Sequence, residues 1–140
     1  MSALTKLQEW LTSFPGNDKL QSFKVDYYSE EPGAASLAPT GLVEISRKRD
    51  ILGKTIIANQ YNFAMYYAFA KDEGSAENAD WLIALQEWIQ EQSVLGKVPA
   101  FGDEPETEEI KAENGSIFGA TEEGVAIYMV QLSVNFIKVL

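Results

Sequence analysis

The sequence contains neither cysteine nor histidine among its 140 residues. Without cysteine the chain has no disulfides, no thiolate nucleophile and no cysteine zinc site. Histidine is the usual base at neutral pH and the commonest metal ligand. Its absence excludes Ser-His-Asp and Cys-His hydrolysis, histidine zinc sites and acetyl transfer with a histidine base. Only carboxylate, lysine or tyrosine chemistry, or no chemistry at all, remains.

Basic residues and long apolar runs are also scarce. There are 11 Lys and Arg against 21 Asp and Glu, a formal net charge of −10, and such a surface repels phosphate backbones. We therefore expect no specific nucleic-acid binding. No apolar run reaches about 18 residues, so no membrane span is expected, and the N-terminal residues lack a signal-peptide pattern. One basic cluster, Arg47, Lys48 and Arg49, is interpreted as a solvated hairpin end, or alternatively as a contact for an acidic partner.

Reactive motifs are missing as well. The chain has no Walker loop, no Gly-x-Gly-x-x-Gly and no Gly-x-Ser-x-Gly. Acidic residues are concentrated in the segment 103–109, but their spacing does not fit an EF-hand loop. We interpret this segment as a solvated acidic loop, with a calcium or magnesium site as the alternative. The sequence thus predicts a protein that is not an enzyme, with no catalytic residues, no cofactor and no bound metal.

Two long segments alternate apolar and polar side chains, as strands with one buried face do. In residues 57–69 one face is aromatic or aliphatic: Tyr61, Phe63, Met65, Tyr67 and Phe69. In residues 125–140 one face is apolar and the other polar: Val130, Leu132, Val134 and Phe136 against Gln131, Ser133 and Asn135. The apolar faces suit a core, and the polar face suits water or a partner. The second strand runs to the last residue and is a candidate open edge, which neighbouring subunits can pair with.

The remaining patterns predict one domain, residues 1–140, of the α+β class. Apolar spacings of three and four predict helices over 3–14 and 76–95. Strands are predicted over 22–28, 42–49, 54–70, 110–120 and 125–140, with turns at 50–53 and 121–124 and a loop over 30–41. The order α-β-β-β-α-β-β, joined by tight turns, predicts a mostly antiparallel five-stranded sheet with two main helices packed on one face.

Packing and turn residues along nearly the whole chain resemble a family of small phage proteins. The matching segments are Leu7-Gln-Glu-Trp-Leu11 to Phe14-Pro-Gly16, Pro39-Thr-Gly-Leu42 to Ser46-Arg-Lys48, Tyr61-Asn-Phe63, Asn78-Ala-Asp-Trp-Leu82, Gln90-Glu-Gln92, Phe101-Gly-Asp103 and the final strand. They are similar to minor capsid or tail-completion proteins from the tail-assembly regions of Firmicute phages and prophages, and the architecture is similar to that of tail terminators.

The resemblance implies a structural virion protein that forms a ring and caps or joins the tail tube. It implies phage tail tube or connector proteins as partners, and a location in the bacterial host cytoplasm during assembly and then in the virion. The residues expected at the oligomer or partner surface are Gln131, Ser133, Asn135, Arg47, Lys48, Arg49 and Leu37. Leu37 is included because it lies in the predicted loop over 30–41, which is long enough to reach a neighbouring subunit.

Two other functions remain open on the sequence. A head–tail connector or adaptor of similar fold would differ only in its partner. A carboxylate-dependent metal-binding domain or enzyme belongs to another class, and the carboxylates of residues 103–109 are its only support.

Overall fold

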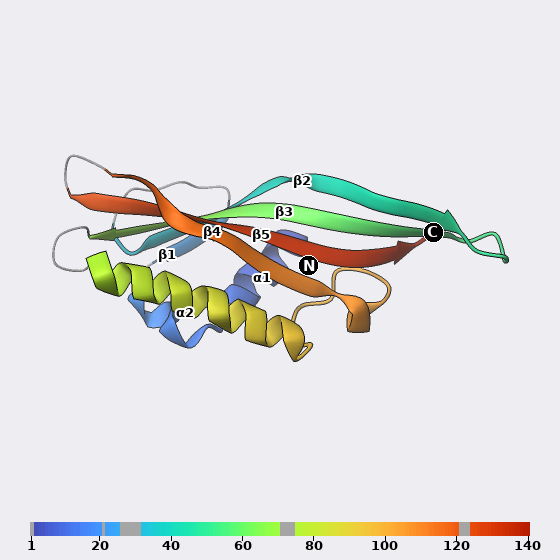
Figure 1. Ribbon diagram of the computed structural model, residues 1–140, viewed down its shortest axis with the longest axis horizontal. Coiled ribbons are helices and arrows are strands. Elements are labelled where there is room, and N and C mark those ends of the chain that lie inside the picture. The colour runs from blue at the N-terminus through green and yellow to red at the C-terminus, as the bar shows by residue number, and fades with distance from the viewer. Residues whose placement is uncertain (1, 21, 26–31, 71–74, 121–123) are drawn as a thin grey trace.

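The computed structural model describes residues 2–20, 22–25, 32–70, 75–120 and 124–140 (Figure 1). In chain order the elements are α1 (Ala3–Leu11), the 3-10 turn η1 (Pro15–Lys19), β1 (Ser22–Val25), β2 (Ala34–Arg49), β3 (Thr55–Ala70), α2 (Ser75–Val94), the 3-10 turn η2 (Pro105–Thr107), β4 (Glu109–Ala120) and β5 (Val125–Val139). The predicted α+β class and element order are therefore confirmed. No helix in these ranges is long and apolar enough to cross a membrane.

The strands form one mixed sheet in the order β1-β2-β3-β5-β4. Strand β1 runs parallel to β2, and the other neighbours are antiparallel. The register between β3 and β5 is unbroken from Ile56 opposite Val139 to Ala70 opposite Val125. This central pair gives the sheet its length, and both helices lie on one face of it (Figure 1).

The core lies between that face and the helices, where the two predicted apolar stripes meet. Phe63 lies opposite Leu132 and Met65 opposite Val130 in the register, and all four side chains are buried. Helix side chains complete the cluster: Leu7, Leu11, Leu82, Leu85 and Ile89. Removing this much apolar surface from water is the main stabilising contribution to the fold. The predicted apolar faces of the two long strands are confirmed.

Indole donors tie the helical layer together. Trp10 Nε1 donates to the carbonyl of Lys97 at 2.9 Å, and Trp81 Nε1 donates to the carbonyl of Gly16 at 2.9 Å. Both indole rings are half-buried, and each N–H that leaves water keeps a hydrogen-bond partner in this way. The two bonds fasten the N-terminal segment to α2 and to the connection that follows it.

A short connection, which we call the clasp (residues 101–103 and Glu108), covers the last part of the outer edge of β5. Asp103 N donates to the carbonyl of Ile137 at 2.8 Å, and Val139 N donates to Asp103 Oδ2 at 2.7 Å. Strand β4 pairs with β5 only as far as Asn135. Beyond that residue the clasp takes the place of β4 beside β5. A Cβ on Gly102 would lie 2.3 Å from the carbonyl oxygen of Ile137, so only glycine allows this approach.

Two predictions of element position are wrong. The predicted loop over 30–41 is strand from Ala34 onward, because β1 and β3 both pair with that segment. The C-terminal strand is not an open edge, because β5 lies between β3 and β4 and its last residues meet the clasp. Predicted positions 26–28, 30, 31 and 121–123 lie outside the described residues.

Candidate functional site

The most exposed part of the sheet is the far end of β2 together with the turn that leads into β3. We call residues 41–54 the hairpin arm. Every described side chain in it is exposed except that of Asp50, and Leu42, Val43 and Ile45 are about half exposed. The arm projects past the helices at one end of the molecule (Figure 1). Leu42 and Val43 are adjacent and therefore lie on opposite faces of the strand. Several exposed apolar side chains on one element make the arm a candidate protein interaction site.

The turn at the end of the arm is held by its own hydrogen bonds. Asp50 Oδ1 accepts from the amides of Leu52 and Lys54, both at 2.9 Å, and the carbonyl of Asp50 accepts from Gly53 N at 3.1 Å. Gly53 has φ +86°, a conformation that a side chain would disfavour, and the predicted turn at 50–53 is confirmed. This ordered turn presents Ile51 and Leu52 to water at 102% and 81% exposure.

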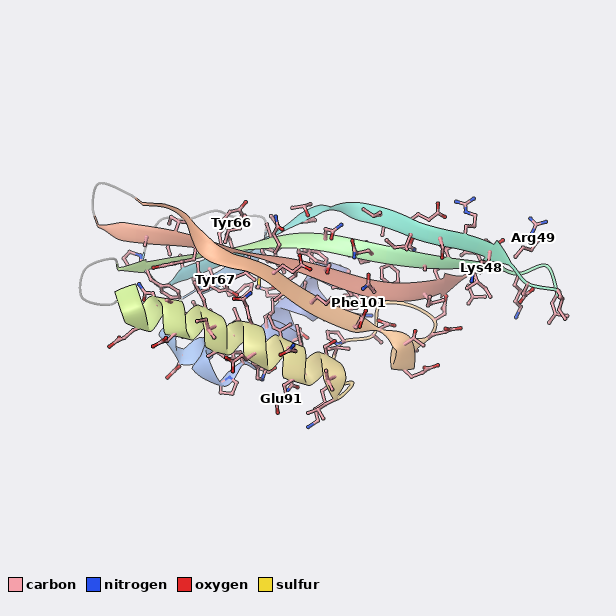
Figure 2. All side chains as sticks on the ribbon, viewed as in Figure 1. Lys48, Arg49, Tyr66, Tyr67, Glu91 and Phe101 are labelled. Atoms are coloured by element: carbon pink, nitrogen blue, oxygen red, sulfur yellow. The ribbon has the colours of Figure 1, made fainter. Side chains whose placement is uncertain are left out.

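Basic side chains surround this apolar tip. Lys48, Arg49 and Lys54 are exposed, and Figure 2 shows Lys48 and Arg49 near the end of the arm. Arg47 Nε pairs with Glu44 Oε1 at 2.8 Å, an exposed pair that contributes little to stability. The arm holds four basic and two acidic residues, a net +2, so the other residues sum to −12 in a chain whose total is −10. The arm is thus a basic projection from an acidic body.

The outer edge of β2 is poorly suited to pairing with another strand. Strand β1 covers only Ala34 to Leu37, which leaves the arm without a described neighbour on that side. The pairing of β2 with β3 is irregular between Pro39 and Gly41 and again between Glu44 and Ser46. Bulges, proline and charge all discourage edge-to-edge pairing. The arm therefore offers its side chains to a partner rather than its backbone.

Leu37, expected on the partner surface, is instead fully buried. It lies opposite Val25 of β1 and Met65 of β3, inside the sheet and within the main core. The structure thus contradicts this part of the predicted surface. The other residues expected at this surface are at least partly accessible, and they form two separate sets: Arg47, Lys48 and Arg49 on the arm, and Gln131, Ser133 and Asn135 on β5.

Gln131, Ser133 and Asn135 lie on the sheet face away from the main core. Gln131 is exposed and the other two are half-buried. Asn135 accepts from Gln60 Nε2 at 3.1 Å and donates to Glu109 Oε1 at 3.3 Å, so it links three strands. A shallow polar hollow of about 210 Å³ lies over Gln131 and Ser133. These residues pair with Ala64, Asn62 and Gln60 of β3, whereas Arg47 pairs with Ile57, so the structure does not join them to the basic tip.

A second hollow, which the sequence did not reveal, lies between α2 and β4. We call it the helix–strand groove. Its volume is about 520 Å³, and its lining includes Ile83, Glu87, Gln90 and Val94 of the helix. These positions are spaced four, three and four residues apart, so they share one side of α2. Ile83 and Val94 are 53% and 82% exposed. The sequence signal that could have indicated the groove is the pair of exposed apolar residues Ile83 and Val94, on the side of α2 away from its buried stripe.

The acidic segment has a structural role at one position. Glu108 is buried, and its two carboxylate oxygens accept from the amides of Phe101 at 2.6 Å and Gly102 at 3.0 Å. The expectation of a solvated loop is therefore wrong for Glu108, although Glu106 and Glu109 are exposed as expected. No group of three acidic side chains in the described ranges is arranged to hold a metal ion.

Burial raises the pKa of Tyr67 above its ordinary value. Its hydroxyl donates to the sulfur of Met65 at 3.1 Å, and its ring lies inside the aromatic cluster with Trp81 at a centroid distance of 5.0 Å. A tyrosine held protonated in a core is a packing residue, not a base.

No family model matches the chain, and no curated protein matches it.

Proposed function

We propose that this protein is a non-enzymatic bacteriophage virion assembly protein, a tail terminator-like or minor capsid component. In this role it forms homo-oligomeric rings and caps or joins the tail tube. The observation that carries the proposal is the hairpin arm, whose tip displays Ile51 and Leu52 on an ordered turn. The resemblance of the packing and turn residues to phage tail-completion proteins supports the same role.

The aliphatic side chains at the tip of the arm are unfavourably exposed to water. Two large aliphatic side chains at a turn gain nothing from water, and turns are ordinarily built from small or polar residues. Transferring each of them to an apolar contact would contribute about 1.5–3 kcal/mol. An ordered turn also loses little conformational entropy on binding. The arm is therefore suited to contact another protein subunit.

The charge of the molecule suits a component of a tail. A formal net charge of −10 gives a surface that does not hold DNA by its phosphates. A ring with such an inner surface would let DNA pass without sticking. The two unlike surfaces, the arm and the acidic body, suit a closed ring, in which one patch of each subunit meets a different patch of the next.

Electron microscopy with the tail tube protein of the same phage region tests the proposal. We expect rings of the protein bound at the ends of tubes. A protein that forms no ring and binds no tube would contradict it, and retention by portal-side proteins instead would favour the head–tail connector role.

A further inference from the structure

We infer that the tip of the hairpin arm of one copy docks into the helix–strand groove of a second copy, head to tail. The inference deepens the proposed function, since it rests on self-assembly and names the contact between neighbouring subunits. It commits to a second copy of this chain as the partner. Three features of the described residues carry it: apolar fit, opposite charge and the separation of the two surfaces.

The first feature is the apolar match. The tip offers Ile51 and Leu52, the two most exposed aliphatic side chains of the arm. The groove offers Ile83 and Val94 from α2, and Ala112 from β4. A cavity of ~150 Å³ holds a benzene-sized group, so a groove of about 520 Å³ has room for both tip side chains. Each surface leaves apolar area in water that the other would cover.

The groove is also ordered, so it needs little rearrangement to receive a partner. Ile110 N donates to Ser93 Oγ at 3.0 Å, which ties β4 to α2 beside the groove. The tip is fixed by Asp50 in the same way. Two preformed surfaces lose less entropy on association than mobile ones do.

The second feature is charge. Glu87, Glu109 and Glu113 line the groove with one basic residue, Lys111, which lies 3.8 Å from Glu109. The tip carries Lys48, Arg49 and Lys54 beside its aliphatic pair. Figure 2 places Lys48 and Arg49 toward the end of the arm. A basic tip and an acidic rim attract each other and set the orientation of docking.

The third feature is that the two surfaces belong to different parts of the molecule. The arm projects past the end of the helical layer, while the groove lies beside α2 (Figure 1). A contact between two different patches of identical chains leaves one free tip and one free groove at the ends. Such a contact repeats from copy to copy, and it gives a closed ring when the rotation between neighbours closes and a filament when it does not.

Disulfide cross-linking tests the contact directly, because the chain has no cysteine of its own. A chain with Leu52→Cys is mixed with a mass-tagged chain carrying Gln90→Cys, a groove residue, and the mixture is oxidised mildly. The matched comparison replaces the second chain by one with Gln131→Cys, on the polar sheet face, which was expected from the sequence to meet a partner and which the proposed docking leaves free. All three positions are exposed, so the fold is expected to tolerate each change.

We expect the Leu52–Gln90 mixed dimer to form at least tenfold faster than the Leu52–Gln131 dimer. Glu87→Lys with Glu113→Lys in the groove chain should slow it about tenfold, and Lys48→Glu with Arg49→Glu in the tip chain should restore it. Equal rates for Gln90 and Gln131, or no rescue by the second charge reversal, would overturn the inference. Rings that persist despite that result leave the proposed function standing. Specific cross-linking without binding to tail tubes would instead overturn only the function.

Discussion

At the scale of single residues, the clasp shows how one carboxylate can fix a strand far from it in sequence. Glu108 satisfies two amides of the segment that lies against β5, and Gly102 permits the close approach. Asp103 then binds the amide of Val139. A charged acceptor shared by two backbone donors is among the stronger hydrogen-bond arrangements. The clasp is thus a stabilising device for the C-terminal strand.

Glu108→Ala should destabilise the protein by about 2–4 kcal/mol, because it leaves the part-buried amides of Phe101 and Gly102 without an acceptor. Chemical denaturation measures the loss. The matched control is Glu106→Ala on the same short turn, an exposed site where a change within about 0.5 kcal/mol is expected. Equal effects at the two positions would show that the hydrogen bonds of Glu108 contribute nothing particular.

Tyr67 makes alkaline stability a second test. Burial raises its pKa in the folded state above the ordinary value of 10. Below pH 10 both states keep the proton, so this residue adds no pH dependence. Above it only the unfolded chain releases the proton, and the free energy of unfolding falls by up to about 1.4 kcal/mol per pH unit. Tyr67→Phe should remove that part of the slope, as denaturation at a series of alkaline pH values would show. Identical slopes in both proteins would contradict the assignment.

At the scale of elements, the periodicity of apolar residues predicts which strand faces are buried better than it predicts which strands are neighbours in the sheet. The alternation in β3 and β5 identifies their buried faces, because each strand packs against helices on one side only. The alternation of side chains carries no information on the order of strands in the sheet. For this reason the sequence suggested an open edge for β5, which in fact lies between β3 and β4. The segment Ala34 to Leu37 has small residues without alternation, and only pairing with β1 and β3 makes it a strand.

Within the candidate site, the turn and the basic cluster were predictable and the groove was not. Gly53 and Asp50 mark the turn locally, and Arg47 to Arg49 are adjacent in sequence. The groove depends on the packing of α2 against β4, which are far apart along the chain. The burial of Glu108 likewise depends on a tertiary contact with Phe101 and Gly102. A run of acidic residues in the sequence does not show which of its carboxylates is buried in the folded protein.

Deletion of residues 136–140 should abolish cooperative folding. It removes Phe136, which is 4% exposed and stacked on Tyr61 at 4.7 Å, together with the pairing to the start of β3. Loss of a buried aromatic residue alone costs about 3–5 kcal/mol, comparable with the whole stability of many domains. Circular dichroism on heating measures the result. Leu140→Ser, which changes an exposed side chain and keeps its backbone bonds to Thr55, is the control. A truncated chain with an unchanged transition would contradict the importance of this segment.

At the scale of the whole molecule, charge and exposed apolar surface are divided between two places. The arm carries a net positive charge and the rest of the chain a strongly negative one. Copies of the chain repel each other on average, but a tip directed at a groove meets opposite charge at short range. Beyond the Debye length of about 8 Å in physiological salt, the general repulsion is screened. Association is therefore favoured in one orientation, which is what a ring requires.

Sedimentation velocity of the unmodified protein and of Ile51→Ser/Leu52→Ser, over the same range of concentrations, tests the central claim most directly. The two substitutions lie on an exposed turn and leave the hydrogen bonds of Asp50 in place. We predict that the unmodified chain forms a discrete oligomer as its concentration rises and that the variant stays monomeric. A monomeric unmodified protein at every concentration, or a variant that assembles equally well, would contradict the account.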